Sequence, residues 1–351
     1  MMDFFHNIKR IYILFSLLLL ITNIIKIEMT GPPLSTIKDK KITIFKFHNC
    51  CGLNSNLMNM IAYKMYYNDI GRSFVVDEYE FNGIGSRTLS KYFLPTFPII
   101  YDKDTSEIYT EQHQIENIND DIRNPKADFT VLSFMDFGHA MINEIKDKFK
   151  TYGVEGYNRM AKEACANLRF SGFAKKSIIT LKQQMKIPNF DKKITAGFHI
   201  RRGDKVDYGE SKKHDASDYV KKLLRAMSSS SYTEGKTIEY CFVATDDYEV
   251  VEELQAALNK YEIGCTLYSL VQPQQKGNQQ EEGQQKEMSH EQILQFLTEM
   301  SMLIDVSYFI GTFDSNVGAI VSLLRSCKWN KKEEVNYYHS YGVDRDDFHM
   351  M

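Results

Sequence analysis

Two adjacent arginines near the middle of the chain are the side chains best suited to chemistry. Residues 193–200 combine β-branched and aromatic side chains, which is typical of a buried strand. Arg201 and Arg202 follow directly, and Asp204 and Lys205 complete a cluster of charge. Guanidinium groups are planar, permanently charged and able to bind two oxygens at once. The pair therefore suits a diphosphate.

The position of this cluster supports a ligand site. In open α/β sheets, ligands bind beyond the carboxyl ends of the strands, and Gly203 allows both a sharp turn and close approach of a ligand. Two simpler interpretations stay open. Charged residues after a strand can form a solvated turn. The tripeptide 202–204 also matches an adhesion motif, although it follows a strand rather than lying at the tip of a long loop.

Two later strands are also expected to end in polar residues. Asp246 and Asp247 follow the apolar stretch 237–244, and the stretch 307–312 leads into another strand-to-helix turn. Strands and helices alternate throughout this half, which predicts a doubly wound parallel sheet. No Gly-x-Gly-x-x-Gly and no P-loop sequence follows a strand, which disfavours dinucleotide and P-loop chemistry.

The first half opens with a strand–helix–strand pattern. We expect a strand at 42–47, a helix at 53–69 and a second strand at 73–76, which is the unit of a parallel sheet. The turn at 52–56 either binds a ligand through its backbone amides or forms a plain helix cap. This half is therefore expected to be α/β as well.

The two halves are expected to be separate domains. The pattern is weak over 80–124, whereas 137–185 is mostly helical. Methionine and aromatic stripes at 141–149 and 160–168 keep helical spacing, and we interpret them as core. Pro188 then precedes the central strand. We predict an N-terminal α/β domain at 31–190 and a nucleotide-binding domain at 191–351.

The N-terminus carries an apolar run. Residues 11–25 contain no charge and follow Lys9 and Arg10. We interpret 1–30 as a short cytoplasmic tail and an uncleaved membrane anchor, with the body of the chain in a lumen. A cleaved signal peptide and a buried core helix are the alternatives.

Composition sets further bounds. The 351 residues are 43% hydrophobic and carry a net charge of -3, which gives no reason to expect a nucleic-acid partner. The six cysteines show no Cys-x-x-Cys spacing, which disfavours a zinc site. Cys241 and Cys265 fall in expected strands, where we interpret them as buried small hydrophobes rather than as a bridge. The sequence does not reveal any disulfide pairing.

Three segments resemble, in order, the motifs of the α1,6-fucosyltransferase family, whose members fucosylate N-glycan cores and chitin oligosaccharides. The segments are His199-x-Arg201-Arg202-Gly203-Asp204-Lys205, Ala244-Thr245-Asp246-Asp247 and Gly311-Thr312-Phe313-Asp314-Ser315-Asn316-Val317. The resemblance covers about 41–325. It implies a GT-B-like fold, in which two α/β halves face each other and the C-terminal half holds most of the GDP-fucose donor.

The resemblance also implies roles for individual residues. Arg201 and Arg202 would grip the diphosphate, Asp204 and Lys205 would organise the loop, and Glu210 would be the general base. Asp246 and Asp247 would hydrogen-bond to the acceptor or the loop, with metal ligation as the lesser alternative. The remaining donor-binding residues would be His199, Tyr219, Glu299, Thr312, Phe313 and Ser315.

The implied reaction is an inverting transfer of fucose from GDP-fucose to a glycan hydroxyl, of α1,6 type and without a metal. The implied setting is the Golgi membrane in a single-pass type II orientation, with a glycan or glycoprotein as acceptor. Two alternatives stay open. One is an inactive membrane-tethered glycan-binding or scaffold protein, since Asp314 stands where the family has a serine. The other is a protein O-fucosyltransferase.

Overall fold

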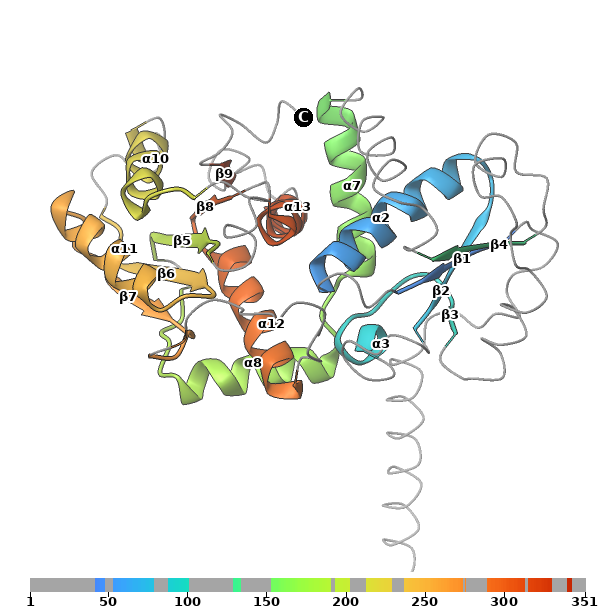
Figure 1. Ribbon diagram of the computed structural model, residues 1–351, viewed down its shortest axis with the longest axis horizontal. Coiled ribbons are helices and arrows are strands. Elements are labelled where there is room, and N and C mark those ends of the chain that lie inside the picture. Colours follow the sequence, from blue (N-terminus) through green and yellow to red (C-terminus); the bar gives the residue numbers. More distant parts are fainter. Residues whose placement is uncertain are drawn as a thin grey trace, which may run out of the picture.

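The computed structural model describes twelve parts of the chain. They are 42–47, 53–78, 88–100, 129–133, 153–190, 193–202, 213–228, 237–273, 275, 289–312, 315–329 and 340–342. Within these parts, two parallel sheets with helices packed on them form an α/β fold (Figure 1). The α/β class predicted from the sequence is confirmed.

The first sheet has four parallel strands in the order β3-β2-β1-β4. Helix α2 (Leu53–Asp69) links β1 to β2, as the sequence predicted. Strands β3 and β4 were not predicted. Strand β3 is only two residues long and lies in a stretch where the sequence shows no periodic pattern. The strands are β1 (Ile42–Lys46), β2 (Ser73–Asp77), β3 (Ile99–Ile100) and β4 (Phe129–Ser133).

The second sheet has five parallel strands in the order β7-β6-β5-β8-β9. The strands are β5 (Thr195–Ile200), β6 (Tyr240–Thr245), β7 (Thr266–Ser269), β8 (Tyr308–Gly311) and β9 (Ser340–Gly342). The helices are α10 (Ala216–Ser228), α11 (Glu249–Lys260), α12 (His290–Asp305) and α13 (Asn316–Trp329). The alternation predicted for this half is confirmed, except that β9 was not foreseen.

Both faces of the second sheet are covered. Helices α10 and α11 lie on one side, and α12 and α13 lie on the other (Figure 1). Ala196, Phe198 and Ile200 of β5 pack into the cluster formed with α10 and α11. Gly197 faces α12, because a Cβ built there would lie 2.8 Å from Val306 Cγ2. Since strand side chains alternate, His199 shares the α12 side with Gly197.

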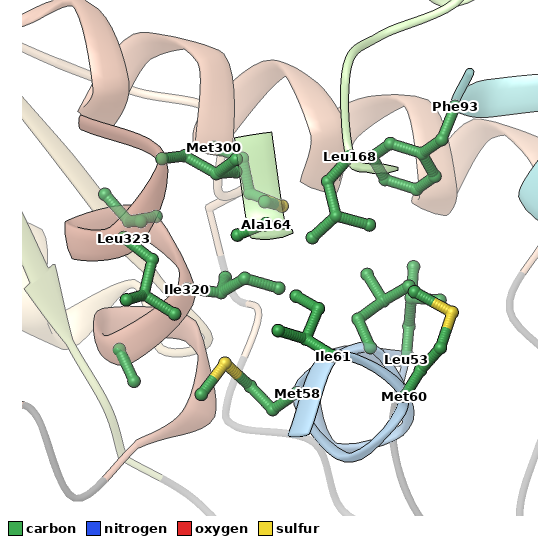
Figure 2. Close-up of a cluster of buried hydrophobic side chains, with 14 of the residues drawn as sticks. Leu53, Met58, Met60, Ile61, Phe93, Ala164, Leu168, Met300, Ile320 and Leu323 are labelled. Atoms are coloured by element: carbon green, nitrogen blue, oxygen red, sulfur yellow. The ribbon is translucent and has the colours of Figure 1, made fainter. Parts of the chain in front are cut away.

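Helices join the two sheets through one hydrophobic core. Helix α7 (Gly153–Asn167) packs on both α2 and α13, and α8 (Gly172–Gln184) packs on α12. Figure 2 shows this junction, where side chains from α2, α7, α12 and α13 converge. Ala164 and Leu168 are buried in it and Met160 packs against it, which confirms the core stripe predicted at 160–168. The stripe predicted at 141–149 lies outside the described residues.

Cys241 and Cys265 form a disulfide, with their Cα atoms 5.8 Å apart. The interpretation of both residues as small hydrophobes was therefore wrong. Cys241 pairs with Leu267 in the ladder between β6 and β7. Cys265 lies two residues before Leu267, so both side chains emerge on the same face of the sheet. The register between strands produces this proximity, and the sequence does not show it.

In the part of the chain that the structure describes, no helix combines the length and apolar character needed to cross a bilayer. The membrane anchor expected at 1–30 falls outside that part. The anchor therefore stays a prediction.

Candidate active site

The polar strand ends predicted from the sequence lie side by side. Strand β5 is central, with β6 on one side and β8 on the other. Ile200 pairs with Thr245, and His199 pairs with Gly311. The residues that follow these three strands therefore meet at one edge of the sheet, where ligands of α/β proteins bind.

Asp246 holds the turn that follows β5. Its Oδ2 lies 2.8 Å from Arg201 Nη1, and its Oδ1 accepts a hydrogen bond of 2.9 Å from the backbone N–H of Arg202. The Asp246 side chain is 8% exposed and that of Arg201 is 20% exposed. A carboxylate that forms an ion pair with one side chain and accepts a hydrogen bond from the backbone fixes the turn more firmly than either contact alone.

Arg202 has a different partner from its neighbour. Its Nη2 lies 3.1 Å from Glu253 Oε2 on α11, and its side chain is only 7% exposed. Its Nη1 donates a long hydrogen bond of 3.4 Å to the carbonyl of Arg201. The two guanidinium groups are thus held by separate acids, one at the end of β6 and one on a helix.

Asp247 continues the turn after β6. Its Oδ1 accepts a 3.0 Å hydrogen bond from the backbone N–H of Glu249 at the start of α11. The hydroxyl of Thr245 also bridges the backbone N–H and carbonyl of Asp247. These contacts bind Asp247 to the first turn of α11, and so link the end of β6 to the helix that carries Glu253.

His199 is a neutral imidazole under ordinary conditions. Burial and, to a smaller extent, the positive charge of Arg201 together lower its pKa to about 3. Its Nδ1 is buried and has no hydrogen-bond partner among the described residues. A neutral histidine can donate from one ring nitrogen and accept at the other. His199 therefore contributes a hydrogen-bonding group to this edge without adding a charge.

Tyr219 and Thr312 form a buried contact at the end of β8. The Tyr219 Oη lies 2.5 Å from Thr312 Oγ1. The backbone N–H of Ser315 donates to the Thr312 carbonyl at 3.3 Å. Helix α13 starts one residue later. Ser315 therefore lies at a helix N-terminus, where backbone amides and the helix dipole favour anions.

Glu299, on α12, has a pKa raised from an ordinary 4.5 to about 8. Burial is the main cause, the hydrogen bond from Gln295 opposes the rise, and the charge of Asp246 adds to it. The carboxyl is therefore mostly protonated at neutral pH. The Gln295 Nε2 lies 3.2 Å from Glu299 Oε1 and 3.2 Å from the Leu270 carbonyl. A protonated carboxyl at this place can donate as well as accept a hydrogen bond.

Several predicted site residues lie outside the described parts, namely Asp204, Lys205, Glu210 and Phe313. Two residues near the site were not predicted. Glu253 could have been noticed because it lies one turn into the helix that follows Asp246 and Asp247. Gln295 gives no sequence signal beyond its spacing of four from Glu299. Among the described residues, no group of three or more His, Cys, Asp or Glu could hold a metal ion.

A known family model covers this edge of the sheet. Residues 172–340 match the family model described as alpha-(1,6)-fucosyltransferase N- and catalytic domains. This segment is similar to that family. It runs from the start of α8 to the first residue of β9, and so includes all three strand ends. The resemblance drawn from the three motifs is confirmed, as is the expectation of a fucosyltransferase enzyme.

Solved fucosyltransferase structures are similar to this chain at low sequence identity. NodZ from Bradyrhizobium is 14% identical, with a TM-score of 0.47 over 82% of this chain and 93% of its own. Arabidopsis thaliana FUT1, a mutant in complex with GDP, is 10% identical, with a TM-score of 0.49 over 87% and 72%. POFUT1 in complex with GDP-fucose is 12% identical, with a TM-score of 0.44 over 83% and 95%. A comparison with curated proteins finds no match.

Proposed function

We propose that this protein transfers fucose from GDP-fucose to a glycan hydroxyl, with inversion at the anomeric carbon and an α1,6 linkage. The family match supports the reaction class. The observation that carries the proposal is the pair Arg201 and Arg202, held by acids at the carboxyl end of β5 between β6 and β8. Two permanent positive charges at that edge suit a nucleotide diphosphate.

The donor would meet both charged and neutral groups. Arg201 is the more exposed of the two arginines, so its guanidinium is the one that we assign to the phosphate oxygens. Ser315 and the N-terminus of α13 add hydrogen-bond donors for the same anion. His199, Tyr219, Glu299, Thr312 and Phe313 complete the donor site that we propose.

The reaction needs a base and a stabilised leaving group. The acceptor hydroxyl oxygen attacks the anomeric carbon of fucose, and the bond from that carbon to the diphosphate oxygen breaks. GDP leaves with the bonding electrons, and the arginines stabilise its growing negative charge. We assign the hydroxyl proton to Glu210, and we assign the organisation of the turn to Asp204 and Lys205.

We propose that the arginines provide the charge stabilisation that a divalent cation provides in other transferases. If so, chelation with EDTA should leave the transfer rate unchanged. A rate that falls on chelation and returns when Mg²⁺ or Mn²⁺ is added would overturn this part of the proposal.

We further propose that the protein works in the Golgi lumen, anchored by its N-terminal run. The disulfide between Cys241 and Cys265 supports an oxidising compartment. Protease protection in intact microsomes tests this placement, because a lumenal body resists added protease until detergent opens the membrane.

The main experiment compares Arg201→Ala with Arg225→Ala, a variant at an exposed arginine on α10. We expect Arg201→Ala to lose about three orders of magnitude in transfer from GDP-fucose, with unchanged circular dichroism. Arg225→Ala should transfer like the wild type. Full activity in Arg201→Ala would exclude the proposed role. Calorimetry with GDP distinguishes the enzyme from an inactive scaffold protein. A wild-type chain that binds no GDP would not be the enzyme that we propose.

A further inference from the structure

We propose that Glu253, on α11, is a positioning residue of the donor site, which acts by holding the guanidinium of Arg202. This inference rests on the proposed function, since the donor is the ligand whose binding Glu253 would affect. Neither the three sequence motifs nor the strand ends include Glu253. It reaches the site from a helix through one ion pair.

The pair joins a buried cation to a half-exposed acid. The Arg202 side chain is 7% exposed, whereas that of Glu253 is 44% exposed. An ion pair between two exposed side chains contributes little to stability. A buried guanidinium is different, because it cannot lose its charge by giving up a proton and is costly to leave unpaired. Glu253 therefore compensates a charge that the fold has already removed from water.

Glu253 also adds a second acid at the end of these strands. Asp246 already binds the side chain of Arg201 and the backbone N–H of Arg202. The carboxylate on the Arg202 guanidinium is that of Glu253. Loss of Glu253 would leave this guanidinium to seek another acid, and Asp246 already binds the backbone of the same residue. The two arginines would then compete for Asp246, so Glu253 would affect both although it touches one.

Arg202 is held at its backbone as well as at its side chain. The N–H of Arg202 is fixed on Asp246 and its guanidinium is fixed on α11. A side chain held at both ends loses little further conformational freedom when a ligand binds. Its contribution should therefore appear in donor affinity more than in the rate of the chemical step. The experiment therefore measures donor affinity and kcat separately.

The experiment uses the full chain with Glu253→Ala, Glu253→Gln and the neighbouring control Glu252→Gln. Glu252 is exposed on the same helix. We expect Glu253→Ala to raise both the Kd for GDP and the KM for GDP-fucose about tenfold, with kcat changed less than about threefold. Glu253→Gln keeps an oxygen that can accept from Arg202 and should recover about half of the loss on a logarithmic scale. Glu252→Gln should match the wild type.

A double-mutant cycle tests the coupling directly. If Glu253 acts through Arg202, then Glu253→Ala should have little further effect on GDP affinity in an Arg202→Ala background. Additive losses would overturn the inference, as would a Glu253→Ala variant that binds GDP like the wild type. A merely structural role would lower the unfolding temperature and leave the Kd of the folded fraction unchanged, which would also overturn it.

The failure of this inference differs from the failure of the proposed function. A wild-type chain that binds no GDP and transfers no fucose refutes both. A wild-type chain that binds GDP, with a Glu253→Ala variant that binds equally well, refutes the positioning role alone.

Discussion

Glu299 shows how strongly its surroundings set the ionisation of one side chain. Its carboxyl is desolvated on α12 and lies in the field of Asp246, so its pKa is about 8. The unfolded chain ionises the same group near its ordinary value of 4.5. Between these two pH values, folding takes up a proton. The contribution of Glu299 to stability is therefore complete below pH 4.5 and is lost as the pH rises towards 8.

Replacement of this residue by Gln should remove that dependence. We expect Glu299→Gln to gain stability relative to the wild type as the pH rises from 5 to 9. The gain should reach on the order of 1–2 kcal/mol at pH 9, since partial exposure reduces the full effect of the pKa shift. Urea unfolding at pH 5, 7 and 9 measures it. A difference that does not change with pH would show that Glu299 ionises normally.

The disulfide allows a second prediction at this scale. It closes a loop with a sequence separation of 24, for which a stabilisation of about 2–4 kcal/mol is typical. The double variant Cys241→Ala/Cys265→Ala should therefore unfold at lower urea concentration than the oxidised wild type. Addition of reductant should destabilise the wild type more than the variant, because the variant lacks this bond and keeps the disulfide in which Cys165 takes part. Equal stability with and without reductant would contradict the bond.

The sequence predicted part of the residue-scale picture. Arg201 and Asp246 could be named because both follow apolar strands, and adjacent parallel strands place their ends together. The position of Glu253 after Asp246 and Asp247 could have drawn attention to it, but its contact with Arg202 could not be predicted, because that contact depends on how α11 lies against the sheet. The pairing of Cys241 with Cys265 was missed for a similar reason, since it depends on register.

At the scale of elements, the packing of α12 on β5 depends on a residue without a side chain. A Cβ at Gly197 would lie 2.8 Å from Val306 Cγ2 and 3.0 Å from Leu303 Cδ2. Both neighbours are buried, so neither can move without disturbing the core. The close approach of helix and strand therefore requires glycine at this position.

Gly197→Ala should destabilise the protein by about 1–3 kcal/mol. Gly264→Ala is a suitable control, because a Cβ there would meet nothing within 4 Å. Chemical denaturation of both variants measures the difference. Equal midpoints for the two variants would mean that α12 moves away from the strand more easily than its packing suggests.

The carboxyl end of α12 is held by one buried cation. Arg325, on α13, donates from Nη1 to the carbonyls of Leu303, Ile304 and Val306, and from Nη2 to that of Ser307. These carbonyls lie in the last turn of α12 or just beyond it. A guanidinium thus satisfies backbone acceptors that the helix leaves without partners.

Arg325→Met should cost about 3–5 kcal/mol, because it leaves these buried carbonyls without donors. The stability of Arg325→Lys should lie between that of Arg325→Met and that of the wild type, since an ammonium group has fewer donors than a guanidinium. The unfolding free energy of the three proteins tests this order. A methionine variant as stable as the wild type would show that water replaces the guanidinium.

Elements with a clear period were predictable from the sequence, and short ones were not. Helix α2 has the predicted bounds, and β5, β6 and β8 lie within a few residues of theirs. Strands β3 and β9 span two and three residues. Strands of this length are too short to show an alternation of apolar and polar residues in the sequence.

At the scale of the molecule, the two sheets share a core rather than meeting at a thin interface. Buried side chains of α2, α7, α12 and α13 form a single cluster. Polar contacts reinforce it, since the Tyr157 hydroxyl on α7 lies 2.6 Å from Ser326 Oγ and donates to the Ser322 carbonyl on α13. A continuous core couples the unfolding of the parts that share it.

We therefore expect one cooperative unfolding transition. Far-ultraviolet circular dichroism and tyrosine fluorescence should give the same midpoint on heating or in urea. Two separated transitions would show that the sheets unfold as independent domains, which would favour a division of the chain at residue 190.

The edge strand β9 has a practical consequence for the design of shortened chains. Its three residues pair with Phe309, Ile310 and Gly311 of β8. A truncation that removes them would uncover the polar backbone of β8 directly beside the proposed donor site. Uncovered strand edges recruit other chains, so such a fragment should aggregate even though every motif of the family remains in it.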